Sequence, residues 1–294
     1  MIHTIDLHFQ ERPGTIASFV METEDGLALV ESGPASTLPS LEIGLQTLGH
    51  ALADVRHVFL THIHFDHAGA AWRLAELGAQ VYVHPFGMPH LQDPKVLWKS
   101  AKRIYHDRMD SLWGEMQPIA ETQLHAIEDQ TAITVGQHRF IAHHTPGHAK
   151  HHIAWQLDRI LFAGDVAGVR LQGGPVQPPC PPPDIDIEDW HTSIQRMRAL
   201  VIDQLYLTHF DIVTDIGKHL DELDATLDRW ATWMHPHAEQ GTNTEAITSK
   251  FVDFVREELT KSSLSTKQIA DYETANPAFM SVGGLMRYWK KRLA

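Results

Sequence analysis

The heptapeptide Thr-His-Ile-His-Phe-Asp-His at residues 61–67 follows directly on the apolar run Val-Phe-Leu at residues 58–60. Such an apolar run is typical of a buried β-strand, so we expect a strand that carries the polar cluster at its end. In extended backbone, alternate side chains share a face, which places His62, His64 and Asp66 together while His67 opens the next segment. Imidazoles and a carboxylate suit zinc, iron or manganese, and a cluster without thiolates disfavours a closed structural zinc site. The heptapeptide therefore predicts an open metal site at a strand end.

The alternative is that Asp66 caps a helix that begins near His67, with the neighbouring histidines solvated in a loop. A helix cap accounts for the carboxylate but for none of the three histidines of residues 61–67. The metal-site interpretation is therefore favoured.

Composition restricts the kind of protein. A chain of 294 residues can form one large α/β domain with a helical appendage. Its 24 Lys and Arg against 37 Asp and Glu give a net charge of −13, which disfavours a nuclease or another nucleic-acid-binding protein. A single cysteine, Cys180, permits no intramolecular disulfide. With no secretory signal and no apolar stretch of about 20 residues, we expect a cytoplasmic protein without a membrane partner.

Two blocks of strands and helices follow one another along the chain. In the first block we expect an opening antiparallel meander and then a βαβ order, with strands at residues 4–9, 15–22, 27–31, 55–61 and 80–84 and helices at 39–48 and 67–77. The second block repeats this plan, with strands at residues 131–135, 139–143, 152–156, 159–162 and 204–208 and a helix at 187–200. This order predicts an α/β fold.

Two insertions interrupt these blocks. Residues 93–118 interleave lysines and arginines with aromatic and aliphatic side chains and are expected to be helical. They could form a lid that holds an anionic substrate, or an amphipathic helix that packs its aromatic stripe, and the sequence leaves both open. Residues 173–183 are rich in proline and predict a stiff loop, a second natural wall of a substrate pocket.

The chain is expected to be helical from residue 216 onward. Apolar side chains from Ile216 to Met234 recur every three or four positions, which indicates one buried helix face. Thr242 and Glu245 match a capping box for the next helix, and a final helix is expected at residues 284–292. We therefore divide the chain into a domain at residues 1–215 and a helical extension at 216–294 that packs on it, whose apolar helices could also form a homodimer interface.

Three later strand ends carry further candidate ligands. The segment HHTPGH at residues 143–148 presents His148 at a Pro-Gly turn, FAGD at 162–165 ends on Asp165, and LTHF at 207–210 contains His209. Ligand groups of α/β sheets gather at the carboxyl ends of strands, so these side chains can join the first cluster. Each motif alone is weak, but the three in this order strengthen the metal-site prediction.

Together, the motifs THIHFDHAG, HTPGH, LFAGD and LTHF resemble the ordered motifs of the metallo-β-lactamase superfamily over about residues 4–215. The stretches GHAKHH and GDVAG, the proline loop and the helical carboxyl terminus are most similar to its glyoxalase II-like (hydroxyacylglutathione hydrolase-like) branch. The resemblance implies an αββα sandwich with two metals at one edge of the sheets. Carried over by residue, it implies that the first metal binds His62, His64 and His148, the second binds Asp66, His67 and His209, and Asp165 bridges them.

One departure from the family pattern lies at Glu31-Ser32-Gly33, where relatives usually carry aspartate and threonine before the glycine. Glu31 is longer by one methylene and is expected to keep the role of orienting the metal-binding histidines. His152 is expected to do the same, and His143, His144 and His151 also flank the site.

The predicted function is a dinuclear metal-dependent hydrolase of a small molecule, with zinc favoured and iron or manganese as alternatives. A bridging hydroxide would attack an ester, thioester or lactone, and Asp66 would orient it and move its proton. Three alternatives remain: a mononuclear iron persulfide dioxygenase, a small-molecule phosphodiesterase and a non-catalytic metal-binding protein. A nucleophilic role for Cys180 is disfavoured, because no histidine and acid neighbours accompany it in sequence.

Overall fold

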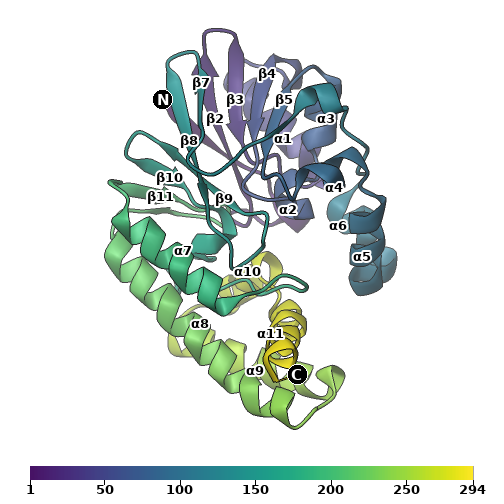
Figure 1. Ribbon diagram of the computed structural model, residues 1–294, viewed down its shortest axis with the longest axis vertical. Coiled ribbons are helices and arrows are strands. Elements are labelled where there is room, and N and C mark those ends of the chain that lie inside the picture. Colours follow the sequence, from purple (N-terminus) through teal and green to yellow (C-terminus); the bar gives the residue numbers. More distant parts are fainter. Residues whose placement is uncertain (294) are drawn as a thin grey trace.

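Two six-stranded β-sheets pack face to face between layers of helices in the computed structural model, which describes residues 1–293 (Figure 1). The first sheet has the order β1-β2-β3-β4-β5-β6 and the second the order β12-β11-β10-β9-β8-β7. The strands of the first sheet are β1 (Ile2–Asp6), β2 (Ala17–Thr23), β3 (Gly26–Val30), β4 (Val55–Phe59), β5 (Gln80–Val83) and β6 (Leu124–Ala126). Those of the second are β7 (Ala132–Val135), β8 (His138–His144), β9 (Ile153–Leu157), β10 (Ile160–Phe162), β11 (Gln204–Tyr206) and β12 (Ile212–Val213).

The strand directions explain why the polar strand ends meet. The meander β1-β2-β3 is antiparallel, as predicted, and β3, β4, β5 and β6 run parallel to one another. In the second sheet β10 runs parallel to β11, while β8 and β9 are antiparallel. Parallel strands end at the same edge of a sheet, so the loops after β4 and after β10 and β11 can converge.

Three apolar clusters hold the layers together. Between the sheets, Phe59 of β4 stacks on Phe140 of β8 with ring centroids 4.0 Å apart, and Trp155 of β9 packs edge-on against Phe59. The outer face of the first sheet is covered by helices that include α1 (Leu38–Thr47), α2 (Phe65–Ala68) and α3 (Ala71–Glu76), and that of the second by α7 (Ile187–Ala199) and α8 (Ile216–Glu239). The predicted αββα sandwich is therefore confirmed.

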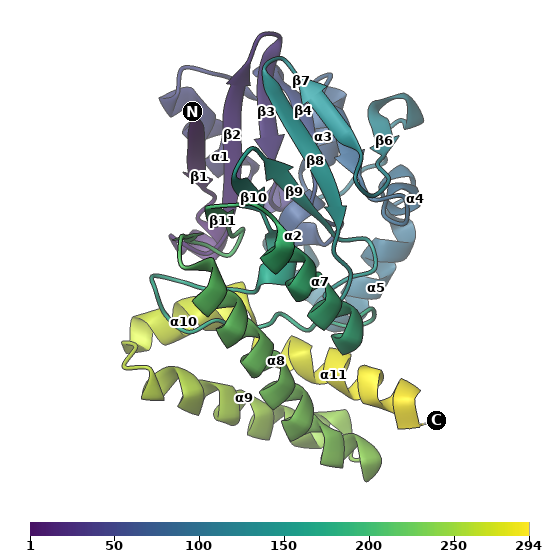
Figure 2. The same cartoon turned by 60° about the vertical axis from the view of Figure 1, so that its left-hand side comes forward.

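The carboxyl-terminal helices α8, α9 (Thr244–Lys261), α10 (Thr266–Ala275) and α11 (Ala278–Leu293) gather at one end of the sandwich (Figure 2). The predicted apolar stripe of α8 is buried, and Leu223, Leu227 and Trp230 are fully enclosed in one cluster with side chains of the second sheet. The helical extension is thus confirmed, and the domain boundary at residue 215 stays a prediction.

The predicted helical character of residues 93–118 is confirmed for α5 (Lys95–Tyr105) and α6 (Met109–Trp113), which follow the short helix α4 (Met88–Gln92) in sequence, while residues 114–118 are not helical. The side chains of Leu112 and Trp113 are buried, while Lys95, Lys99 and Lys102 are exposed. This arrangement favours the amphipathic packing of the segment, and a lid movement stays a prediction.

Several predicted boundaries were wrong. Residues 67–77 form two helices, α2 and α3, because the Ala70 N–H donates to Gly33 O and not to a carbonyl of its own helix. The cap of α9 is Asn243, whose side chain accepts from the Glu245 N–H at 2.9 Å, so the Thr242 capping box is wrong. Strands β6 and β12 were missed, since two or three residues are too few to show an alternating pattern. Within residues 1–293, no helix has the length and apolar character to cross a membrane.

Candidate metal centre

The candidate ligands come from loops at one edge of the two sheets. His62 and His64 lie between β4 and α2, and Asp66 and His67 lie in α2 itself. The other three follow strands of the second sheet: His148 after β8, Asp165 in the 3₁₀ turn Gly164–Ala167 after β10, and His209 after β11. The structure thus brings all seven predicted ligands together, in the two groups His62, His64, His148, Asp165 and Asp66, His67, His209.

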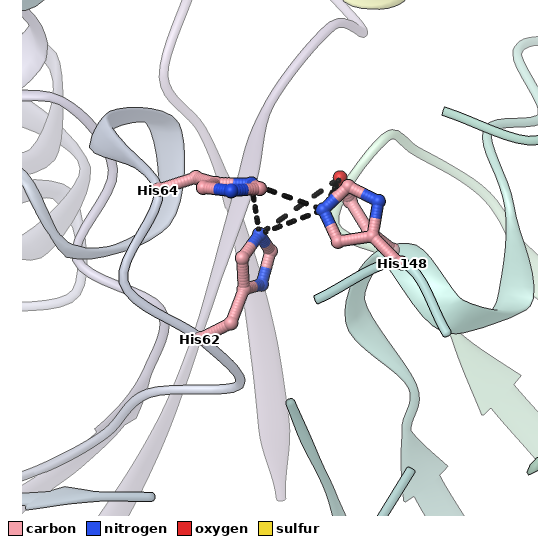
Figure 3. A group of neighbouring side chains, drawn as sticks. His62, His64 and His148 are labelled. Carbon is pink, nitrogen blue, oxygen red and sulfur yellow. Dashed lines mark hydrogen bonds and ion pairs between the residues drawn. The ribbon is translucent and has the colours of Figure 1, made fainter. Parts of the chain in front are cut away.

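In the first group, three imidazoles point toward one another (Figure 3). His62 Nε2 lies 2.9 Å from His64 Nδ1, and His148 Nε2 lies 3.2 Å and 3.0 Å from these two nitrogens. Asp165 Oδ2 lies 3.3 Å from His148 Nε2 and 4.0 Å from His62 Nε2. Three nitrogens and one carboxylate oxygen therefore converge on one point.

The second group lies on the other side of the same carboxylate. Asp165 Oδ1 lies 3.2 Å from His67 Nε2 and 3.5 Å from His209 Nε2. Asp66 Oδ2 lies 3.3 Å from His209 Nε2 and 3.8 Å from His67 Nε2. Asp165 thus directs one oxygen to each group.

The donor atoms fit divalent cations. His148 Nδ1 donates to Pro179 O at 2.7 Å, so the neutral ring presents the lone pair of Nε2 to its group. His67 Nε2 and Asp165 Oδ1 are both buried and lie 3.2 Å apart, but neither forms a hydrogen bond with the other or with any other described residue. Such orphaned polar atoms cost free energy unless another partner satisfies them, and a cation satisfies both. The cluster is consistent with divalent metal binding.

The charge of the site differs between its two halves. Burial and the neighbouring His67 and His64 hold the pKa of His62 well below its ordinary value, and burial lowers the pKa of His64 to about 3. Burial opposes ionisation of His67 as well, but the carboxylates of Asp165 and Glu31 raise its pKa well above the ordinary value. Burial raises the pKa of Asp66, yet His67 and His209 outweigh it and lower this pKa to about 2. The first half thus offers neutral imidazoles, and the second contains ionised carboxylates.

Glu31 contacts His67 of the second group on the ring nitrogen that faces away from the site. Its Oε1 accepts from His67 Nδ1 at 2.9 Å, from the Thr61 hydroxyl at 2.5 Å and from the Thr208 hydroxyl at 3.1 Å. Glu31 is buried and has a positive φ of 65° directly after β3. The contact that was expected for Glu31 is present, and it directs Nε2 of His67 into the site.

The other flanking histidines lie in different surroundings. His152 is fully buried beside His62, with ring centroids 5.2 Å apart, and its Nδ1 contacts the Thr145 hydroxyl at 2.8 Å. His143 contacts Gln130 and Gln156, and His144 contacts the carbonyl of Ile127, so neither of them contacts a candidate ligand by a hydrogen bond. The side chain of Cys180 is fully buried, which raises the pKa of its thiol and disfavours the nucleophilic role further.

Two groups that orient ligands have no signal in the sequence. They are backbone carbonyls: Pro179 O accepts from His148, and Thr15 O accepts from His209 Nδ1 at 2.9 Å. A carbonyl is common to all residue types, so only the fold reveals which one approaches a ligand.

A cavity of about 650 Å³ opens from this cluster. Its inner end is formed by side chains of both ligand groups, including His64, Asp66 and His209, together with His151. Its walls come from α5 and α6 on one side and from α9, α10 and α11 on the other. The metal centre is therefore accessible to a small molecule.

The family model of the metallo-beta-lactamase superfamily matches residues 12–209, which is more than half of the chain and includes all seven candidate ligands. The chain belongs to the metallo-beta-lactamase superfamily. The match ends before α8, so the carboxyl-terminal helices lie outside the residues that the family model matches.

Similar superfamily members include a metallo-beta-lactamase fold-containing protein of Sulfurisphaera tokodaii, 25% identical over 76% of this chain and 84% of that protein. A hydroxyacylglutathione hydrolase of Maricaulis maris is 26% identical over 61% of this chain, and the match spans 58% of that enzyme. Among solved structures, a metallo-beta-lactamase family protein of Thermus thermophilus has the same fold over 100% of this chain and 94% of its own, with a TM-score of 0.73 and 20% identity.

Proposed function

We propose that this superfamily member is a hydrolase that binds two divalent metal ions, zinc foremost, and cleaves an ester, thioester or lactone bond of a small molecule. The observation that carries the proposal is the position of Asp165, whose two oxygens face two separate groups of three ligands. A site that binds one metal ion does not require the second group of ligands. Bound there, the cations would supply Lewis-acid polarisation of a carbonyl and acidify a water molecule at neutral pH.

The chain's own residues have separate tasks in this proposal. Asp66 is ionised at neutral pH and lines the cavity, so its carboxylate can orient the attacking water and accept its proton. Pro179 O and Glu31 hold His148 and His67 with their free nitrogens directed at the site. Such preorganised ligands need no rearrangement before the reaction.

His151 is a candidate substrate contact beside the ligands. Its ring lines the cavity at 5.6 Å from the ring of His64, and the residue is buried, with a relative exposure of 8%. Burial holds its pKa well below the ordinary value, so the ring is neutral, and its Nδ1 has no hydrogen-bond partner among the described residues. A neutral imidazole with unused hydrogen-bonding capacity suits the polar end of a substrate.

The glyoxalase II-like branch is part of the proposal. Its support is the likeness to the hydroxyacylglutathione hydrolase of Maricaulis maris, which extends over little more than half of that enzyme. We therefore place an acyl compound, with a thioester first and esters and lactones next, ahead of phosphoesters.

The test is metal analysis of freshly purified protein, followed by a panel of thioesters, esters, lactones and phosphodiesters on the same preparation. We expect two zinc ions per chain and hydrolysis of at least one acyl compound, lost with a chelator and restored by zinc. One iron per chain with oxygen consumption on a persulfide would establish the dioxygenase instead. Cleavage confined to phosphodiesters, or no turnover by fully loaded protein, would also overturn the proposal.

A further inference from the structure

The cavity wall is mostly apolar and is built from helices that are distant in sequence. Phe65 of α2 and Leu112 and Trp113 of α6 form one side, and Val255 and Leu259 of α9 and Met280 of α11 form the other. All but Met280 are buried, and Met280 is half-buried. A wall of this kind contributes hydrophobic binding over a large area and few directional contacts.

The two sides meet across the cavity. The Tyr105 hydroxyl, at the end of α5, lies 3.7 Å from Met280 Sδ of α11. Burial raises the pKa of Tyr105, so this hydroxyl is neutral and adds no charge to the wall. The exposed side chains of Val96 on α5 and Phe279 on α11 also line the cavity, so apolar groups continue from its interior to solvent.

Two of the three arginines that line the cavity are paired with carboxylates of the protein. Arg12 pairs with the buried carboxylate of Asp271 at 2.9 Å, and Arg256 pairs with Glu273 at 2.6 Å. Of the arginines that line the cavity, Arg108 alone has no carboxylate partner within residues 1–293, and its contact is Gln10 at 3.5 Å. An anionic group therefore finds little unpaired positive charge here, while an apolar group finds a continuous surface.

From these contacts we infer that the cavity binds an extended apolar acyl chain, so that medium-chain acyl compounds are the substrate class of the site. The statement that this acyl chain belongs to a substrate rests on the proposed hydrolase function. The binding of an acyl chain in the cavity does not depend on that function. A volume of about 650 Å³ is within the ordinary range for a whole small molecule. The carbonyl would lie at the inner end, beside His64, Asp66 and His151, with the chain directed between α6 and α9.

The test compares straight-chain p-nitrophenyl esters from acetyl to octanoyl, and separately the binding of acetate, butyrate, hexanoate and octanoate by calorimetry, on the same metal-loaded protein. Each buried methylene is expected to strengthen binding and to raise kcat/KM about threefold to fourfold, until the cavity is filled. The carboxylates serve as probes without turnover, so the two measurements fail independently.

A substitution that fills the cavity locates the effect. Met280→Trp is expected to lower the octanoyl-to-acetyl ratio of kcat/KM by tenfold or more, because its ring occupies the space between α11 and Tyr105. Met88→Trp is the matched control: Met88 is another half-buried methionine, it lies on α4, and it does not line this cavity. Its ratio should equal that of the wild type.

The outcomes separate the two proposals. Ester hydrolysis that does not depend on chain length, with octanoate bound no tighter than acetate, overturns the acyl-chain inference and leaves the hydrolase in place. Tighter binding of longer carboxylates without hydrolysis of any thioester, ester or lactone supports the cavity assignment and removes the hydrolase. Equal effects of Met280→Trp and Met88→Trp on the ratio would also contradict the inference.

Discussion

Replacing Glu31 by glutamine tests how the second group of ligands is held. The carboxylate accepts four hydrogen bonds from three residues: the His67 ring, the Thr208 hydroxyl, and both the hydroxyl and the N–H of Thr61, the last at 3.3 Å. Glutamine has nearly the same shape but turns one acceptor oxygen into an NH₂ donor. That NH₂ must face either the Thr61 N–H or the His67 side, so at least one contact is lost.

The size of the effect follows from the role of His67. A ligand histidine that loses its charged hydrogen-bond partner typically loses about 10-fold to 100-fold in metal affinity, or about 1.4 to 2.7 kcal/mol. Glu31 contacts His67 directly but reaches His62 of the first group only through the Thr61 hydroxyl, which lies 3.0 Å from His62 Nδ1, so the larger loss should fall on the metal ion of the second group. Glu31→Asp shortens the side chain by one methylene and should weaken the 2.9 Å contact to His67 Nδ1 less than glutamine does, because the charge is kept.

The assay is competition for zinc against a chromophoric chelator, with the two binding steps resolved. We expect one of the two binding steps to shift by about 10-fold to 100-fold in Glu31→Gln and the other to change less. Glu22→Gln is the matched control, because Glu22 is exposed and far from the site. Unchanged affinities for both zinc ions in Glu31→Gln would refute the orienting role of Glu31.

Three further predictions concern catalysis, pH dependence and stability. His151→Phe keeps a planar ring without nitrogens, so we expect kcat/KM for acyl substrates to fall about tenfold while the metal content stays unchanged. His151→Asn should recover part of this loss. Equal activity of the wild type and both variants would contradict a substrate contact. Burial and the neighbouring His144 lower the pKa of His84 to about 4. As the pH falls below about 6.5, the unfolded chain therefore binds a proton at this residue before the folded chain does. Because of this residue, the free energy of unfolding should fall by about 2 kcal/mol between about pH 7 and about pH 5. Urea unfolding of metal-free wild type and His84→Asn should show this pH dependence reduced in the variant, and identical slopes would be evidence against it. Leu227→Ala should lower the unfolding free energy by about 2 to 5 kcal/mol, because Leu227 is fully buried. Thr232→Ala, at an exposed position of the same helix, should lower it by less than about 0.5 kcal/mol. Similar losses at the two positions would contradict the packing of α8.

Much of the site was predictable because its side chains are chemically distinctive and sit at strand ends. The heptapeptide at residues 61–67, His148, Asp165 and His209 are separated by long stretches of sequence, yet each follows a strand whose carboxyl end lies at the same edge. The partition of these ligands between two groups came from the resemblance to the family. Alternation along the strand alone would have placed Asp66 with His62 and His64, but α2 begins at Phe65 and turns Asp66 toward His209.

Other features could not be predicted, since they depend on tertiary contacts. The cavity wall joins α6 to α9, about 140 positions apart, and nothing local to either helix indicates the other. The break between α2 and α3 depends on Gly33, which lies far from Ala70 in sequence but accepts its hydrogen bond at 2.9 Å. The true cap of α9 lies one position from the predicted one, because Asn243 and Thr242 are both residues that favour helix caps.

Counting the metal ions per chain tests the central claim most directly, in the wild type and in His209→Ala by elemental analysis of purified protein. His209 lies in the second group and does not contact the nitrogens of His62, His64 and His148. We expect two divalent ions per wild-type chain and one per His209→Ala chain, with the first group still loaded. One ion per wild-type chain that persists unchanged in His209→Ala would contradict a dinuclear centre.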